Sequence, residues 1–116
     1  MVLEKEAHRA EFAKEYCADQ VFVNPPRQSP GESTGSHSDR VSKHILDNME
    51  GLYRGFDVCI EASGKEECMQ MGIKVCRPGG MYVQVGNYDP SKHPQIPMSD
   101  VASKVLTVRG ISITLS

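Results

Sequence analysis

The sequence lacks the features that mark several large classes of protein. No apolar run approaches the roughly 18 residues that a membrane span requires. The chain has 13 basic and 15 acidic residues, and its formal net charge of -2 provides no electrostatic attraction to nucleic acid or another polyanion. The amino terminus is charged from Glu4 onward, which is not the pattern of a secretory signal. We therefore expect a cytoplasmic protein without a membrane or nucleic-acid partner.

Metal-binding and nucleophilic motifs are scarce as well. The four cysteines show no CxxC spacing, and the four histidines form no HExxH pair. The sequence contains no P-loop, and no serine or cysteine is accompanied by a matched base. For a cytoplasmic protein we expect free, buried thiols, with a disulfide and a metal site as the alternatives. The cysteines are Cys17, Cys59, Cys68 and Cys76.

The sequence does contain an alternation of strand and helix signals. Short apolar and β-branched runs predict strands, and apolar residues three or four positions apart predict helices. The predicted strands cover residues 1–4, 20–23, 56–62, 81–85 and 105–109, and the predicted helices cover 7–17, 41–52, 66–77 and 99–104. Strands that alternate with helices form βαβ units, so we expect an α/β fold with a parallel sheet and flanking helices.

Two segments are predicted to interrupt this alternation. Residues 24–40 hold three prolines, four serines and two glycines, so we predict a mobile surface loop that packs against nothing. The helix after it would be capped by Ser38 or Asp39. Residues 77–80, Arg-Pro-Gly-Gly, are typical of the end of a helix, with the next strand starting at Met81.

Three strand ends carry the candidate binding residues. In a doubly wound sheet, ligands bind at the carboxyl ends of the strands. Glu4 ends the first strand, where an acid can accept the hydroxyls of an adenosine ribose; the alternative is a solvated acid in the first turn of a helix. Residues 61–64, Glu-Ala-Ser-Gly, and 85–87, Val-Gly-Asn, let a flat ligand approach the backbone, or are ordinary tight turns. Glu61 alone assigns no mechanism, because it is one carboxylate without a partner.

Longer stretches resemble a known family. The segments RAEFAKEYCAD (9–19), GFDVCIEASGKEECMQMGIKVCRPGGMYVQVGN (55–87) and SKVLTVRG (103–110) resemble the cofactor domain of zinc-dependent medium-chain dehydrogenases, in the polyol dehydrogenase group that acts on sorbitol, xylitol and L-arabinitol. The match covers most of the chain outside residues 24–40 and the last six. The resemblance implies that a sugar alcohol is oxidised to a ketose by hydride transfer to NAD, in a homo-oligomer.

The resemblance also implies roles for individual residues. Glu4 and Arg9 match positions beside the adenosine ribose, and an acid there disfavours the 2′-phosphate of NADP. A loop beside the adenine end is matched by Ala62, Ser63 and Gly64, and the segment against the nicotinamide is matched by Val85, Gly86 and Asn87.

Some parts of the family pattern have no counterpart in the sequence. The GxGxxG turn and its strand would lie before Met1, and no residue matches a catalytic zinc ligand. We therefore expect residues 1–116 to form a partial Rossmann-type dinucleotide-binding domain without the first strand, the GxGxxG turn or the catalytic zinc domain. Such a chain is expected to be an inactive fragment. The alternatives are a non-catalytic fragment that binds adenosine or serves in interaction, and part of a methyltransferase that uses S-adenosylmethionine.

Overall fold

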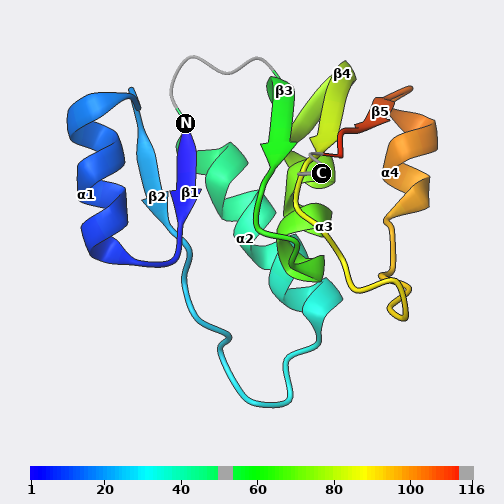
Figure 1. Cartoon of the computed structure of the whole chain (residues 1–116), viewed down its shortest axis with the longest axis horizontal. Helices are drawn as coiled ribbons and strands as arrows, with labels where there is room; N and C mark the ends of the chain where they lie inside the picture. Colours follow the sequence, from blue (N-terminus) through cyan, green and yellow to red (C-terminus); the bar gives the residue numbers. More distant parts are fainter. Residues whose placement is uncertain (50–53, 113–116) are drawn as a thin grey trace. The chain divides into compact units, whose positions relative to one another are not determined.

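A computed structural model describes residues 1–49 and 54–112 of the chain (Figure 1). The chain divides into two compact units, Met1–Glu32 and Ser33–Ser116. Strands and helices alternate along both units, and every pair of neighbouring strands is parallel. The α/β fold class predicted from the sequence is therefore confirmed.

The first unit is a single βαβ element. Strand β1 (Val2–Glu4) pairs in parallel with β2 (Val21–Val23), and helix α1 (Ala7–Tyr16) connects them. Ala10 is the buried residue of α1, whereas Cys17, the residue that caps its carboxyl end, is exposed. The prediction of a buried thiol is therefore wrong at this position.

The second unit contains a three-stranded parallel sheet and three helices. In chain order its elements are α2 (Thr34–Asn48), β3 (Phe56–Glu61), α3 (Glu66–Val75), β4 (Cys76–Gln84), α4 (Met98–Ser103) and β5 (Thr107–Gly110). The strand order is β3-β4-β5. The predicted parallel pairing of β3 with β4, joined by α3, is confirmed.

The core of the second unit lies between its sheet and α3. Met69, Ile73, Cys76 and Tyr82 form the buried apolar cluster. Cys59 of β3 stands opposite Tyr82 of β4 and packs against the same cluster. Because side chains alternate along a strand, Val58 and Ile60 lie on the other face of β3, where both are exposed.

Part of the predicted loop at residues 24–40 is helical. Helix α2 begins at Thr34, and its cap is Ser33, whose Oγ accepts a hydrogen bond from the Ser36 amide at 3.1 Å. Ser38 is fully buried and donates to Gln70 Oε1 of α3 at 2.9 Å. The prediction that this segment packs against nothing is wrong for residues 33–40. The small side chain of Ser38 lets the two helices approach closely, and its hydroxyl finds its partner on α3.

The predicted stop of α3 at Arg-Pro-Gly-Gly is also corrected. Helix α3 ends at Val75, and β4 already begins at Cys76. The pairing with β3 shifts register between Phe56 and Val58, so the glycines belong to an irregular start of a strand. Gly79 has a positive φ of 75° and donates its N–H to Lys104 O at 2.7 Å.

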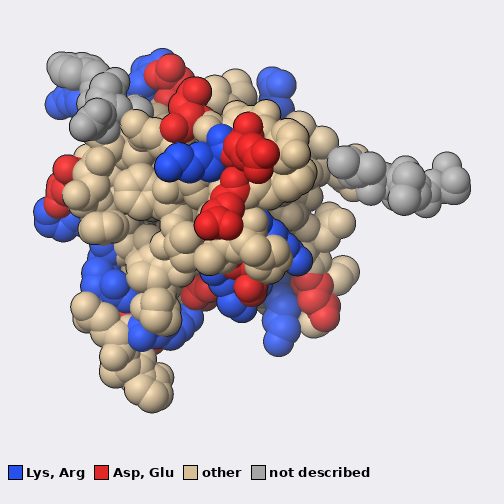
Figure 2. Space-filling view, turned by 90° about the vertical axis from the view of Figure 1, so that its left-hand side faces the viewer, with Lys and Arg blue, Asp and Glu red and all other residues tan. Residues whose placement is uncertain are grey.

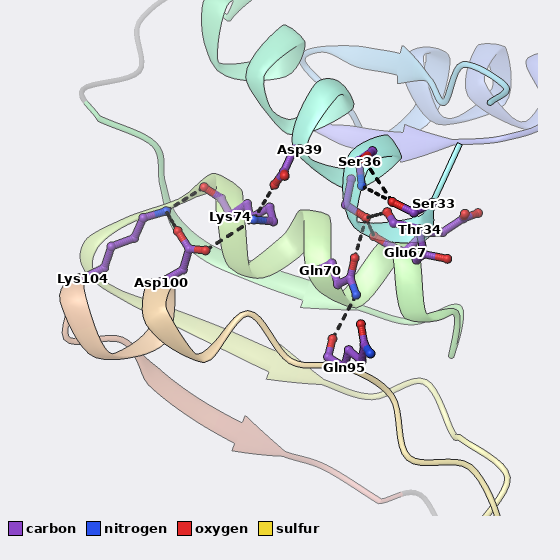
Figure 3. Close-up of polar contacts among 11 residues, drawn as sticks. Ser33, Thr34, Ser36, Asp39, Glu67, Gln70, Lys74, Gln95, Asp100 and Lys104 are labelled. Atoms are coloured by element: carbon purple, nitrogen blue, oxygen red, sulfur yellow. Dashed lines mark hydrogen bonds and ion pairs between the residues drawn. The ribbon is translucent and has the colours of Figure 1, made fainter. Parts of the chain in front are cut away.

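Charged side chains join the three helices of the second unit. Lys74 Nζ of α3 lies 2.6 Å from Asp39 Oδ1 of α2 and 3.4 Å from Asp100 Oδ2 of α4 (Figure 3). Burial alone would lower the pKa of Lys74, but these two carboxylates raise it, and the net direction is upward. Lys104 Nζ donates to Lys74 O at 2.8 Å, so the end of α4 is tied to α3.

The surface shows no separation of charge on the face drawn in Figure 2, where basic and acidic side chains are interspersed. Within the described residues, none of the helices has the length and apolar character needed to cross a membrane.

Candidate functional site

The carboxyl ends of β3 and β4 are joined by main-chain hydrogen bonds. Glu61, the last residue of β3, accepts the N–H groups of both Val85 and Gly86 at its carbonyl oxygen, each at 2.9 Å. We call residues 62–64 the first rim and residues 85–87 the second rim. The two segments that the sequence singled out separately are therefore in direct contact at one edge of the sheet.

The carboxylate of Glu61 lies beneath the first rim and is 5% exposed. Its Oε1 accepts the Ser63 amide at 2.5 Å and the Ser63 hydroxyl. The Gly64 amide lies 3.1 Å from both carboxylate oxygens. Gln84 Nε2 donates to Oε2 at 2.5 Å. A buried carboxylate needs such a set of donors to offset the loss of its water.

Gln84 extends this network to the second rim and to the core. Its Nε2 also donates to Gly86 O at 2.8 Å, and its Oε1 accepts the hydroxyl of Tyr82. Burial raises the pKa of Tyr82, and the charge of Glu61 adds to this effect. The Tyr82 hydroxyl therefore stays protonated and acts as a donor.

The glycines of the two rims are required by their mutual contact. A Cβ on Gly86 would lie 2.2 Å from Gly64 N and 2.8 Å from Glu61 Oε2. A Cβ on Gly64, whose φ is 74°, would lie 2.4 Å from Asn87 O. The space left by the missing side chain of Gly86 is thus filled by the protein itself. In addition, the Val85 amide is already bonded to Glu61, so the main-chain groups that remain for a ligand are fewer than the sequence suggested.

Tyr88 follows the second rim directly. Its hydroxyl is buried and has no hydrogen-bond partner among the described residues. Burial and the nearby charge of Glu61 raise the pKa of Tyr88 to about 12. The hydroxyl is therefore neutral near physiological pH.

Glu4 and Arg9, which lie in the first unit, form a separate candidate. Glu4 Oε1 accepts the amides of Lys5 at 2.8 Å and Glu6 at 3.1 Å. The bond from the Glu6 amide is the main cause that lowers the pKa of Glu4, against a smaller opposing effect of desolvation, and the charge of Arg9 contributes. Since both bonds use Oε1, the turn does not use Oε2. Arg9 is exposed on α1.

The described residues do not fit a zinc ion. They contain no group of three or more His, Cys, Asp or Glu side chains that could hold a metal. All four cysteines are free. Cys59 and Cys76 belong to the apolar core, and the proximity of Cys76 together with burial raises the pKa of Cys59. Burial likewise raises the pKa of Cys68, whereas the hydrogen bond from Cys59 lowers the pKa of Cys76.

Parallel strands with connecting helices, and two glycine rims at one carboxyl edge, define an α/β protein with a Rossmann-like arrangement of strands. The sequence model of the family described as zinc-binding dehydrogenase matches residues 1–115, and the chain belongs to this family.

Relatives agree with this assignment. The chain is 43% identical over 102 residues to the probable D-xylulose reductase A of Arthroderma otae, and 38% identical to the D-xylulose reductase A of Aspergillus oryzae. Each match covers 88% of this chain and 25% of the relative, so the chain spans about a quarter of the length of these curated relatives.

Solved structures share the fold. Benzyl alcohol dehydrogenase from Acinetobacter calcoaceticus matches with a TM-score of 0.70 at 19% identity, over 96% of this chain and 27% of that one. The 2R,3R-butanediol dehydrogenase from Bacillus subtilis matches with a TM-score of 0.67 at 23% identity, over 94% and 26%. A zinc-binding dehydrogenase from Sinorhizobium meliloti, solved bound to NADP, matches with a TM-score of 0.72 at 21% identity, over 94% and 29%.

Sequence reasoning identified both rims but missed what connects them. Gln84 belongs to no motif in the sequence, Tyr82 is predicted from the sequence to be only a core or surface residue, and Glu61 is a single carboxylate without a predicted partner. The partner is Gln84, which stands opposite Glu61 in the β3–β4 register. A usable signal was present, because both strands place a polar residue just before a rim.

Proposed function

We propose that residues 1–116 are a partial dinucleotide-binding domain of an NAD-dependent polyol dehydrogenase. The whole enzyme would oxidise a secondary alcohol of a sugar alcohol to a ketose by hydride transfer. The observation that carries the proposal is the contact between the two glycine rims at the carboxyl edge of β3 and β4, where α/β sheets bind ligands. The D-xylulose reductases among the relatives support a polyol as the substrate class.

The proposed roles of the residues follow from their surroundings. Because the two rims touch, Ala62–Gly64 and Val85–Asn87 would face the same stretch of the cofactor rather than its opposite ends. Glu4 would accept the ribose hydroxyls through Oε2, and Arg9 would lie near the same ribose. The pKa of Glu4 is already well below neutral and the hydrogen bond from the Glu6 amide lowers it further, so Glu4 is anionic and its negative charge repels the 2′-phosphate of NADP. NAD is therefore the proposed cofactor.

Ligand binding by the purified chain tests this proposal. Saturation-transfer NMR should show contact with NAD that exceeds contact with NADP. Glu4→Gln should weaken NAD binding and reduce the preference over NADP. Glu6→Gln makes the same change of charge two residues away and should have no effect. Binding of S-adenosylmethionine in place of NAD, or of no nucleotide, would overturn the proposal in favour of a methyltransferase or an interaction fragment.

Catalysis by the chain alone is not part of the proposal. The described residues offer no cluster that could hold zinc, so we expect no group that would activate the alcohol. Purified chain mixed with NAD and xylitol or sorbitol should give no increase in absorbance of the reduced cofactor. Turnover that Glu4→Gln abolishes would contradict this expectation.

A cytoplasmic location is also proposed. It is supported by the four free cysteines, which are typical of a reducing compartment.

A further inference from the structure

We propose that Glu61 is a positioning residue that couples the two rims, so that the first rim cannot move without the second. The consequence for cofactor binding rests on the proposed function. The coupling itself rests only on the contacts of Glu61, which joins the rims through both its backbone and its side chain.

The contacts of Glu61 divide between the two rims. Toward the first rim, its carboxylate accepts the amides of Ser63 and Gly64. Toward the second rim, its carbonyl oxygen accepts the amides of Val85 and Gly86. One residue thus holds four main-chain N–H groups that belong to segments more than 20 positions apart in the sequence.

Gln84 closes a second connection between the same segments. Its Nε2 lies 2.5 Å from Glu61 Oε2 and 2.8 Å from Gly86 O, so one amide nitrogen bridges the carboxylate and the second rim. The Tyr82 hydroxyl donates to Gln84 Oε1 and fixes which way the amide faces. The orientation of the Gln84 amide is therefore set by Tyr82, a residue of the core.

Steric contact removes the remaining freedom. The Cα of Gly86 faces the amide of Gly64 so closely that no side-chain carbon fits between them. A displacement of the first rim toward the second would push Gly86 directly. The hydrogen bonds resist separation of the two rims, and this contact resists their approach. A movement of one rim in either direction therefore moves the other.

The chemistry requires a carboxylate at position 61. Every group that faces its two oxygens is a donor, and a carboxylate is an acceptor only. Glutamine at this position has nearly the same volume but would direct its own NH₂ at Gln84 Nε2. Gln84 could relieve that conflict by turning its amide over. Its Nε2 would then leave Gly86 O, and the bridge would be lost.

Amide hydrogen exchange measured by NMR on the whole chain tests the coupling. In Glu61→Gln we expect exchange to accelerate about tenfold or more at Ser63, Gly64 and Gly86 alike. The amide of Ile73, in the core, should keep its rate and thereby exclude general unfolding. Glu66→Gln is the matched control, because it changes the charge of a neighbouring glutamate that bonds to Gln95 instead. Acceleration confined to Ser63 and Gly64 would overturn the coupling.

A second variant keeps the test decisive if Glu61→Gln does not fold. Gln84→Leu removes the bridge but leaves the bonds from Glu61 to Ser63 and Gly64. We expect the Gly86 amide to exchange faster than in the unaltered chain. The amides of the first rim should also exchange faster than in the unaltered chain. Unchanged exchange at Gly86 in this variant would overturn the proposal.

Titration with NAD separates the coupling from the proposed function. If the rims act together on the cofactor, Glu61→Gln should raise the dissociation constant for NAD by about the same factor by which it accelerates amide exchange in the rims. Accelerated exchange with undiminished NAD binding would limit Glu61 to a structural role and overturn its role as a positioning residue. Accelerated exchange in a chain whose unaltered form binds no NAD would refute the proposed function and leave the coupling established.

Discussion

The close contact between Gly86 and the first rim leaves no room for a side chain at position 86. A Cβ would lie 2.2 Å from Gly64 N, and a backbone atom cannot move aside as the end of a flexible side chain can. We expect Gly86→Ala to lower the free energy of unfolding by about 1–3 kcal/mol, measured by urea denaturation. Gly35→Ala is the control, because nothing lies within 4 Å of its added carbon. Equal stability of the two variants would refute the packing argument.

Two tyrosine hydroxyls near the rims differ in their hydrogen bonding. The hydroxyl of Tyr82 donates to Gln84, whereas that of Tyr88 is buried with no partner among the described residues. Tyr82→Phe should cost about 1–3 kcal/mol, because it leaves a buried acceptor unpaired. Tyr88→Phe removes an unsatisfied group and should leave the stability unchanged or higher. The reverse order in urea denaturation would show that Tyr88, and not Tyr82, is the bonded residue.

Tyr88 also makes the stability depend on alkaline pH. Its pKa is raised to about 12 in the folded chain, above the value of about 10 for a solvated tyrosine. The folded state holds this proton more tightly, so the contribution is complete below about pH 10 and is lost as the pH rises toward 12. We expect stability to fall less steeply over this interval in Tyr88→Phe. In the same variant, a titration followed by tyrosinate absorbance should lack one of the tyrosines that ionise late.

At the scale of elements, the first turns of α2 depend on serine. Ser38 is fully buried and bonds to Gln70 of α3 and to Thr34 O within α2. We expect Ser38→Ala to destabilise the chain by about 1–3 kcal/mol, because Gln70 Oε1 loses a buried donor. Ser29→Ala, in the exposed segment before α2, should have no effect. Circular dichroism during urea denaturation measures the stability of both variants. Equal stability of the two would indicate that residues 33–40 form a loop, as the sequence predicted, and not a packed helix.

At the scale of the whole molecule, β3 is an edge strand. The described strands form separate sheets, β1-β2 and β3-β4-β5, and Val58 and Ile60 on β3 are 53% and 68% exposed. An exposed apolar edge strand invites pairing with another chain. We expect the chain to self-associate with rising concentration, and Ile60→Lys to reduce this association in analytical ultracentrifugation. Val105→Lys replaces an even more exposed residue outside the strands and should not reduce it.

Local sequence signals determined the order and type of the elements. Apolar runs identified each of the strands in the described part of the chain, and helical spacing of Val41 and Ile45 located α2, because these periodicities follow directly from backbone geometry. Small residues after β3 and β4 marked both rims, since a close approach of two backbones excludes larger side chains. Helix α2 ends at Asn48, earlier than the predicted end near Leu52, which itself lies outside the described residues.

Tertiary structure decided the boundaries and the partnerships. Serine and glycine at residues 33–36 look like a loop in isolation, but Ser33 caps a helix there and the bond from Ser38 to Gln70 holds that helix against α3. Arg-Pro-Gly-Gly extends β4 because β3 offers it a neighbouring strand. Glu61 gains its role from Gln84, which the parallel register brings opposite it across 23 positions of sequence. Periodicity is a property of a segment, whereas a hydrogen-bond partner depends on which distant segment the fold places beside it.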